Sequence, residues 1–374
     1  MKAKLLLLLL ASFYLALNSC QKNISDLSSA AAKEAASHLT DPSLRTSSAA
    51  SSFFDPLGLV SASQHGILDT LAKGFKFTEG PAVDRGGNVF FTDQPDDKIY
   101  RWDATTGAVT HFLTGTGRSN GMAFDRRGDL IACADMHGEV WKIHPDGSHE
   151  VLVNNYKGKL LNGPNDVWIN PVTGGIYITD PIFPRGYWDN NDPRKTNNPS
   201  WPPTYSQQAA TGKGGHVYYL APGSHSLVRV TTMNGWNTDT WPNGVVGTPD
   251  GKKLYVNNWD GDGNGKLWSF EINEHGRLSN MKVVVSGLAG SDGMSMDDRG
   301  NIYISSGAGV TGYNCNGDKI FFVSTGGGAT NNVFAGKNNK LLIITGGGLT
   351  SPPWPNNQDR LTSLKMNVKG VEKF

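Results

Sequence analysis

The sequence has 374 residues, among them 46 glycines and 19 prolines, and its formal net charge at pH 7 is +1. Glycine and proline at this frequency indicate many turns, and the chain shows little helical periodicity. We therefore expect one all-β domain that buries a large core. A charge this close to zero, without a block of basic residues, excludes the pattern typical of nucleic-acid-binding proteins.

Residues 1–19 resemble an export signal of the lipoprotein type. Lys2 and Lys4 precede an apolar run, and Ser19 lies directly before Cys20. The apolar run is shorter than a membrane-spanning helix requires. In a lipoprotein the cysteine thiol is acylated and becomes the mature N-terminus, so we expect export and a lipid anchor on Cys20 in a bacterial membrane. The alternative is a secreted or periplasmic protein with Cys20 lost or unmodified.

Residues 20–53 are rich in serine and alanine, which bury too little apolar surface to pack as a domain. We predict a tether here, followed by a folded domain over residues 54–374. A long irregular insertion at 183–213 contains Tyr187, Trp188 and five prolines. Such a loop in a compact domain is often functional, so we consider both a lid over one face and a loop without a role.

Six stretches of the chain repeat one pattern. An oxygen-bearing residue begins a short apolar run, and a turn then leads to a second run with alternating apolar residues. The units begin at Glu79, Asn120, Asn165, Asn243, Asp292 and Asn331, so their spacings are 41, 45, 78, 49 and 39 residues. Outer strands follow at Lys98–Asp103, Glu139–Ile143, His216–Leu220, Lys266–Phe270 and Lys319–Val323. A period in the forties predicts a six-bladed β-propeller, with one blade shared by the two ends of the domain.

The first residue of each unit is expected to point into one mouth of the central channel. All six of these side chains carry oxygen, and none is histidine or cysteine. Converging carboxylates and amides suit a hard cation, Ca²⁺ ahead of Mg²⁺, with Mn²⁺ and Zn²⁺ as further alternatives. Asn and Asp before Gly are also ordinary turn residues, but that preference does not explain Glu79 before Gly80. We therefore predict one divalent cation at this ring.

Two other features have competing interpretations. Asp260 and Glu271 have the spacing of an EF-hand calcium loop, but that loop needs flanking helices and here would join two strands. We favour a glycine-rich hairpin turn. His137 and His216 could approach a channel mouth or belong to strand packing, and we predict packing.

The cysteines beyond Cys20 are Cys133 and Cys315, which lie on separate repeats. They could form a disulfide, but we expect two buried free thiols. The sequence has no Cys/His cluster, so a structural zinc is not expected. It also has no G-x-S-x-G motif of the kind that presents a catalytic serine.

Four motifs resemble those of the senescence marker protein / gluconolactonase / luciferin-regenerating enzyme family, over roughly residues 60–350. They are Glu79-Gly80-Pro81, Asn165-Asp166, Pro242-Asn243-Gly244 and Ser291-Asp292-Gly293-Met294. In that family a six-bladed propeller holds one divalent metal, often Ca²⁺, in its channel. The resemblance implies that Glu79, Asn243 and Asp292 ligate the metal, with Asn165 as a further ligand or substrate contact. It also implies that Asp292 is the base in lactone hydrolysis and that Asn120 binds substrate.

The residues and the resemblance together predict a monomeric enzyme that hydrolyses a sugar lactone, such as gluconolactone, to the aldonic acid. A metal-polarised carbonyl and a nearby carboxylate base are consistent with that chemistry. One alternative is a non-catalytic propeller that binds carbohydrate or protein and keeps a structural metal. Another is a hydrolase of a different ester, such as a phosphotriester. Because all of these share the fold, the fold does not distinguish them.

Overall fold

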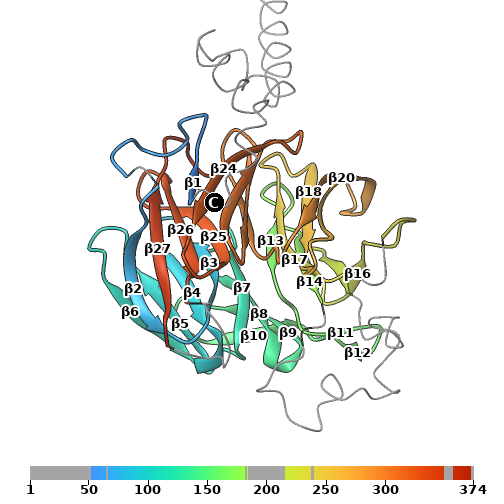
Figure 1. Cartoon of the computed structure of the whole chain (residues 1–374). Coiled ribbons are helices and arrows are strands. Elements are labelled where there is room, and N and C mark those ends of the chain that lie inside the picture. Colours follow the sequence, from blue (N-terminus) through green and yellow to red (C-terminus); the bar gives the residue numbers. More distant parts are fainter. Residues whose placement is uncertain are drawn as a thin grey trace, which may run out of the picture.

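The computed structural model describes residues 52–64, 66–181, 183, 215–236, 240–348 and 357–371. Six sheets surround a central axis (Figure 1), which confirms the predicted all-β, six-bladed propeller. Within these ranges the helical elements are single 3-10 turns at Gln94–Asp96 and Asp135–His137. No helix in the described part of the chain is long and apolar enough to cross a membrane.

The blades follow one another along the chain, each with its innermost strand first. Blade 1 contains β3 (Thr78–Val83), β4 (Val89–Asp93), β5 (Lys98–Trp102) and β6 (Val109–Thr114). Blade 2 contains β7 (Ser119–Phe124), β8 (Leu130–Ala134), β9 (Glu139–Ile143) and β10 (His149–Val153). The short pair β11 (Asn155–Tyr156) and β12 (Lys159–Leu160) precedes blade 3. Blade 3 contains β13 (Val167–Ile169), β14 (Ile176–Asp180), β15 (His216–Leu220) and β16 (Leu227–Arg229).

Blade 4 contains β17 (Pro242–Gly247), β18 (Lys253–Asn258), β19 (Gly265–Ile272) and β20 (Leu278–Leu288). Blade 5 contains β21 (Met294–Met296), β22 (Ile302–Ser306), β23 (Gly309–Tyr313) and β24 (Lys319–Ser324), with β1 (Phe53–Phe54) as a fifth strand. Blade 6 contains β25 (Ala329–Ala335), β26 (Leu341–Gly346) and β27 (Asp359–Lys365), and β2 (Asp69–Phe75) is its outermost strand. The predicted outer strands are all present.

The two ends of the domain share blade 6, as predicted. In Figure 1, β2 near the start of the domain lies beside β27 near its end. The two strands are antiparallel, with Asp69 opposite Ser363 and Phe75 opposite Asp359. This pairing closes the ring of blades without a covalent link.

The hydrophobic core is divided among the six seams between neighbouring blades. Between blades 6 and 1, for example, Phe75, Phe91 and Leu361 are buried in one cluster. The rings of Phe75 and Phe91 meet edge-on, with centroids 5.1 Å apart. Alternating side chains of each sheet therefore pack against the next sheet, and the blades hold one another in place.

Several predictions about the ends and loops fall where the structure gives no description. The signal at 1–19, the lipid site at Cys20 and the tether up to residue 51 lie outside the described residues, while Phe53 of the predicted tether already belongs to β1. The insertion at 183–213 also lies outside them, apart from Phe183.

The stretch from Asp260 is a hairpin turn between β18 and β19, as we favoured. The Oδ1 atom of Asp260 accepts hydrogen bonds from Asp262 N (2.9 Å) and Asn264 N (3.1 Å). Glu271 lies within β19 and accepts a bond from Asn280 Nδ2 (2.6 Å), so it belongs to the sheet and not to the turn.

The two later cysteines differ from each other. Cys133 is buried and free, as expected. Cys315 is half-buried in the turn between β23 and β24 and is disulfide-bonded, so the predicted buried free thiol is wrong there.

Candidate functional site

The inner strands of the six blades surround the channel. They are β3, β7, β13, β17, β21 and β25, and each contacts the inner strands of the neighbouring blades (Figure 1). All six run in the same direction, from the mouth where the repeat unit begins toward the opposite end. The first residues of the six units therefore meet at one mouth of the channel.

Five of the six ring side chains are buried, and Asp292 is half-buried. Glu79 is 2% exposed, and its Oε2 atom accepts hydrogen bonds from Gly80 N (2.7 Å) and from Asn331 Nδ2 (3.2 Å). Because Asn331 belongs to blade 6 and Glu79 to blade 1, this bond joins the first and last repeat units.

Three carboxylates lie near one another at this mouth. Burial raises the pKa of Glu79 well above its ordinary value. Repulsion from the Asp292 carboxylate raises it further, and repulsion from Asp166 adds a smaller increase. The ring is therefore a place where negative charge is crowded and a cation would be favoured.

The glycine that follows most ring residues allows neighbouring inner strands to approach closely. A Cβ atom on Gly80 would overlap the backbone of Asn120, and one on Gly244 would lie 2.5 Å from Asp292 O. A Cβ on Gly293 would overlap the side chain of Asn331. Close packing between blades therefore requires these glycines. The preference of Asn-Gly and Asp-Gly pairs for turns does not explain them.

In the third repeat unit the residue after the ring position is Asp166, where most units have glycine. Asp166 Oδ1 accepts a bond from Val167 N (2.9 Å), and Oδ2 accepts one from Val245 N of blade 4 (3.2 Å). Its carboxylate fills the space beside Gly121 of blade 2. Asp166 therefore links three blades. The sequence signal for it was its place in the motif Asn165-Asp166.

Asn257 is the second functional residue that sequence reasoning missed. It lies on β18 behind the ring, where its Oδ1 atom accepts a bond from Gly244 N (3.0 Å). Its Nδ2 atom donates to the carbonyl oxygen of Asp292 over 2.7 Å. One amide thus fixes the backbone beside Asn243 and the backbone of Asp292. The available signal was a repeated position on the second strand of the unit, where other blades carry Thr92, Thr179, Ser305 and Thr345.

The residues at the mouth fit a hard divalent cation. Asn243 is 3% exposed, and its Oδ1 atom is buried without a hydrogen-bond partner. An unpaired buried amide oxygen is costly unless something binds it. Within the described ranges, no three His, Cys, Asp or Glu side chains are arranged to hold a metal. A cation here would need amide oxygens beside the carboxylates, which is the donor set predicted from sequence.

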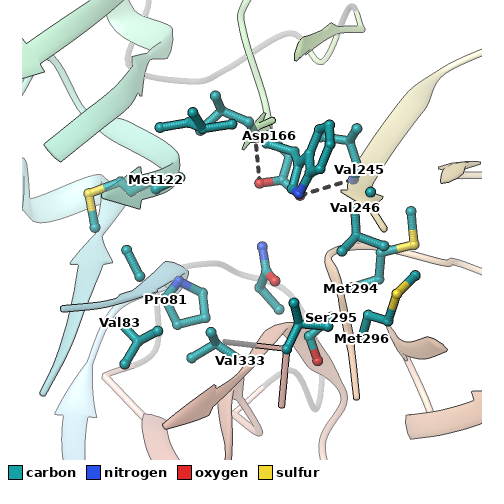
Figure 2. Close-up of a pocket in the computed structure, with 18 of the residues that line it drawn as sticks. Pro81, Val83, Met122, Asp166, Val245, Val246, Met294, Ser295, Met296 and Val333 are labelled. Atoms are coloured by element: carbon teal, nitrogen blue, oxygen red, sulfur yellow. Dashed lines mark hydrogen bonds between the residues drawn. The ribbon is translucent and has the colours of Figure 1, made fainter. Parts of the chain in front are cut away.

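Beyond the ring, the lining of the channel is largely apolar, although it also includes Asp166 and Ser295 (Figure 2). Its lining includes Val83, Met122, Val167, Val245, Met294, Met296 and Val333. Asp166 is the titratable side chain in this lining, and both its oxygens are engaged as described above. Unpaired polar groups are therefore found at the mouth that carries the ring, since Ser295 and Asn332 in the lining bond to each other.

The remaining predicted residues have the following places. Asn120 and Asn165 are buried in the ring, and Asn165 O accepts a bond from Gly121 N (2.7 Å). His137 is exposed and stacks on Trp141, while His216 is buried on β15. The packing interpretation is confirmed for His216, whereas His137 lies in the turn Asp135–His137 after β8 and is not part of a strand.

Comparison with known proteins gives consistent matches along most of the chain. Residues 77–347 match the SMP-30/Gluconolactonase/LRE-like region. A gluconolactonase of Zymomonas mobilis is 26% identical over 303 residues, which is 74% of this chain and 78% of that protein. A gluconolactonase structure from Xanthomonas campestris, described as important in glucose secondary metabolic pathways, is 25% identical with a TM-score of 0.68. It covers 85% of this chain and 96% of its own. Regucalcin from Agrobacterium tumefaciens, a calcium-binding protein, shares the fold at 16% identity and a TM-score of 0.60, over 81% of this chain and 95% of its own.

Proposed function

The chain belongs to the SMP-30/gluconolactonase/LRE-like family, and from this we propose that it hydrolyses a sugar lactone, such as gluconolactone, to the aldonic acid with one divalent cation. The gluconolactonases at 25% and 26% identity support the reaction class. The observation that carries the proposal is the polar mouth, where the buried Glu79 lies near Asp292 and the Oδ1 atom of Asn243 has no partner.

Glu79, Asn243 and Asp292 would hold the cation, with Asn165 beside it. Two carboxylates and amide oxygens favour Ca²⁺ ahead of Mg²⁺, because hard oxygen donors in a flexible number suit the larger ion. When bound, the cation would polarise the lactone carbonyl and stabilise the negative charge that develops on its oxygen. Its charge would also relieve the crowding that raises the pKa of Glu79.

Asp292 is the base in this proposal. It is the half-buried member of the ring, so a water molecule from the mouth can reach it. Its carboxylate takes a proton from that water while the water oxygen bonds to the carbonyl carbon. The ring C–O bond then breaks, and the departing oxygen receives the proton back from Asp292. Such general base catalysis contributes about 10²–10⁴-fold.

The backbone around Asp292 is fixed on both sides. Asp292 N donates to Ser305 O (2.9 Å), and Asp292 O accepts from Asn257 (2.7 Å). A base held this firmly keeps its orientation toward substrate. Asn120 and Asn165 complete the site, since amides both donate to and accept from the hydroxyl groups of a neutral sugar lactone.

The test is to follow acid release from a panel of sugar lactones. We expect hydrolysis with Ca²⁺ that a chelator removes, and a loss of at least about 10²-fold in Asp292→Asn. Asp298→Asn is the matched control, because Asp298 is exposed in the turn of the same blade. Circular dichroism would check that each variant is folded.

Absence of lactone hydrolysis above the buffer rate in the metal-loaded wild type would remove the lactonase proposal. A propeller that binds carbohydrate without catalysis, or a hydrolase of another ester, would then be the better description. Hydrolysis that persists in Asp292→Asn would keep the lactonase and reject Asp292 as its base.

A further inference from the structure

Two tryptophan rings stack at the rim of the mouth in blade 4. Trp241 directly precedes β17 and Trp259 directly follows β18, and Trp259 N donates a hydrogen bond to Trp241 O over 2.9 Å. The ring centroids are 5.3 Å apart, and the ring planes differ by 20°. Phe183, which follows β14, meets both rings edge-on, with centroid distances of 5.0 and 6.0 Å.

This aromatic pair remains partly open to solvent. Trp259 is 38% exposed, and Trp241 is half-buried. Aromatic surface that stays in contact with water loses the free energy that its burial would provide. A fixed, partly exposed pair of rings therefore indicates a surface that binds the apolar face of another molecule. Trp241 Nε1 is buried without a hydrogen-bond partner, so ring packing holds the pair in place.

Trp241 lies just outside the ring of polar residues. It comes two residues before Asn243 at the mouth end of β17, and two residues of extended chain span about 7 Å. This backbone span is comparable with the width of one sugar ring, so a lactone held at Asn243 leaves an attached group within reach of the aromatic pair.

Trp259 is tied to the segment that leads to Asp292. Ser291 Oγ donates to Asn258 O over 2.6 Å, next to Trp259 in the chain. Gly290 N donates to Asp260 O over 2.7 Å, on the other side of Trp259. These bonds hold the aromatic pair in a fixed position beside blades 4 and 5. Blade 4 supplies the unpaired amide oxygen of Asn243, and blade 5 supplies the proposed base Asp292.

We propose that Trp241 and Trp259 form a second sugar subsite, so that the preferred substrate is the lactone of a disaccharide aldonic acid. This inference rests on the lactonase function proposed above. The lactone unit occupies the ring of polar residues, and the second pyranose stacks on Trp259. The C–H bonds of a pyranose face carry weakly positive hydrogens, which pack on the negative face of an indole.

The test compares gluconolactone with two disaccharide lactones, cellobionolactone and maltobionolactone, in the full chain. Trp259→Ala and Trp259→Leu should lower kcat/KM for at least one disaccharide lactone by about 10-fold, through KM and with kcat unchanged. Trp259→Phe keeps a π face and should stay within about 3-fold of wild type. With gluconolactone all three variants should stay within about 2-fold of wild type.

Equal losses on all three lactones, or a Trp259→Leu variant as good as Trp259→Phe, would overturn the sugar subsite. A lactone with an alkyl chain of similar length serves as a third probe, and a preference for it would assign the pair to an apolar group instead. Binding of the disaccharide aldonate, followed by tryptophan fluorescence, separates this inference from the proposed function. Binding that depends on Trp259 without any lactone hydrolysis would keep the subsite and reject the lactonase.

Discussion

His216 is an ionisable side chain that the fold keeps neutral. It is 5% exposed on β15, its Nδ1 atom lies 3.0 Å from Thr231 Oγ1, and its Nε2 atom has no hydrogen-bond partner. Burial lowers the pKa of His216 from 6.5 to about 3, and the nearby Arg229 charge acts in the same direction. The folded protein therefore binds a proton at His216 less readily than the unfolded chain does.

The lowered pKa predicts acid sensitivity. The stability that neutral His216 provides is complete above about pH 6.5 and is lost as the pH falls toward 3. At pH 5 the loss amounts to about 2 kcal/mol of unfolding free energy. Urea unfolding at pH 7.5 and pH 5 should show this difference in wild type and a smaller one in His216→Gln. His275→Gln, at an exposed turn, should behave as wild type, and equal pH dependence in all three would contradict the prediction.

The residues of the site were predictable to different degrees. The ring positions follow from the repeat, because the same place in each unit must reach the same mouth. Asp166 is harder to assign, because its role appears only when three blades meet around it. Asn257 could have been found from the repeat, because the second strands carry Thr92, Thr179, Asn257, Ser305 and Thr345 at matching buried positions. Its two bonds, which join blades 4 and 5, appear only in the structure.

At the scale of elements, the contact between inner strands depends on the glycines after the ring residues. Gly293 illustrates the requirement, because its backbone lies against the side chain of Asn331 on β25, and Gly293 N donates to Thr330 O (2.8 Å). Asn331 in turn donates to Glu79 over 3.2 Å. A side chain at Gly293 would therefore disturb both a strand contact and the polar mouth.

Gly293→Ala should destabilise the protein by about 1–3 kcal/mol, since overpacking forces neighbours from their positions. If the proposed site binds Ca²⁺, the variant should also show a smaller rise in Tm with Ca²⁺, because Asn331 and Glu79 would shift. Gly307→Ala is the matched control in the same blade, where a Cβ meets no atom within 4 Å and the φ angle is not positive. Urea titrations and thermal scans with and without Ca²⁺ provide the measurement. Equal behaviour of the two variants would argue against close packing as the reason for Gly293.

At the scale of the whole molecule, the propeller is predictable because its units repeat. Each unit brings the same strand and turn signals, so the number of blades and the polar mouth follow from one alignment of the sequence with itself. The closing strand β2 is different. Its residues are mostly exposed or half-buried, and the register with β27 includes two bulges, so no periodic pattern fixes it. Long-range pairing between Asp69–Phe75 and Asp359–Lys365 appears only in three dimensions.

Phe75 is the buried side chain of β2 and anchors the closure. It packs on Phe91 and Tyr100 of blade 1, with both centroid distances at 5.1 Å, and it pairs with Asp359 of β27. Phe75→Ala should therefore cost about 3–5 kcal/mol of unfolding free energy. Because blades 6 and 1 also meet at the bond between Asn331 and Glu79, the affinity of the proposed cation site for Ca²⁺ should fall as well.

Phe54→Ala is the control, because Phe54 does not take part in the closure between blades 6 and 1. Phe54 is half-buried on β1 at the outer edge of blade 5, where it pairs with Phe322. It should cost about 1 kcal/mol and leave Ca²⁺ affinity unchanged. Amide hydrogen exchange in Phe75→Ala should increase first in β2 and β27, because local opening begins where the ring is closed without a covalent link. If exchange instead rose uniformly over all six blades, the ring would open as one cooperative unit, and β2 would not be its weakest junction.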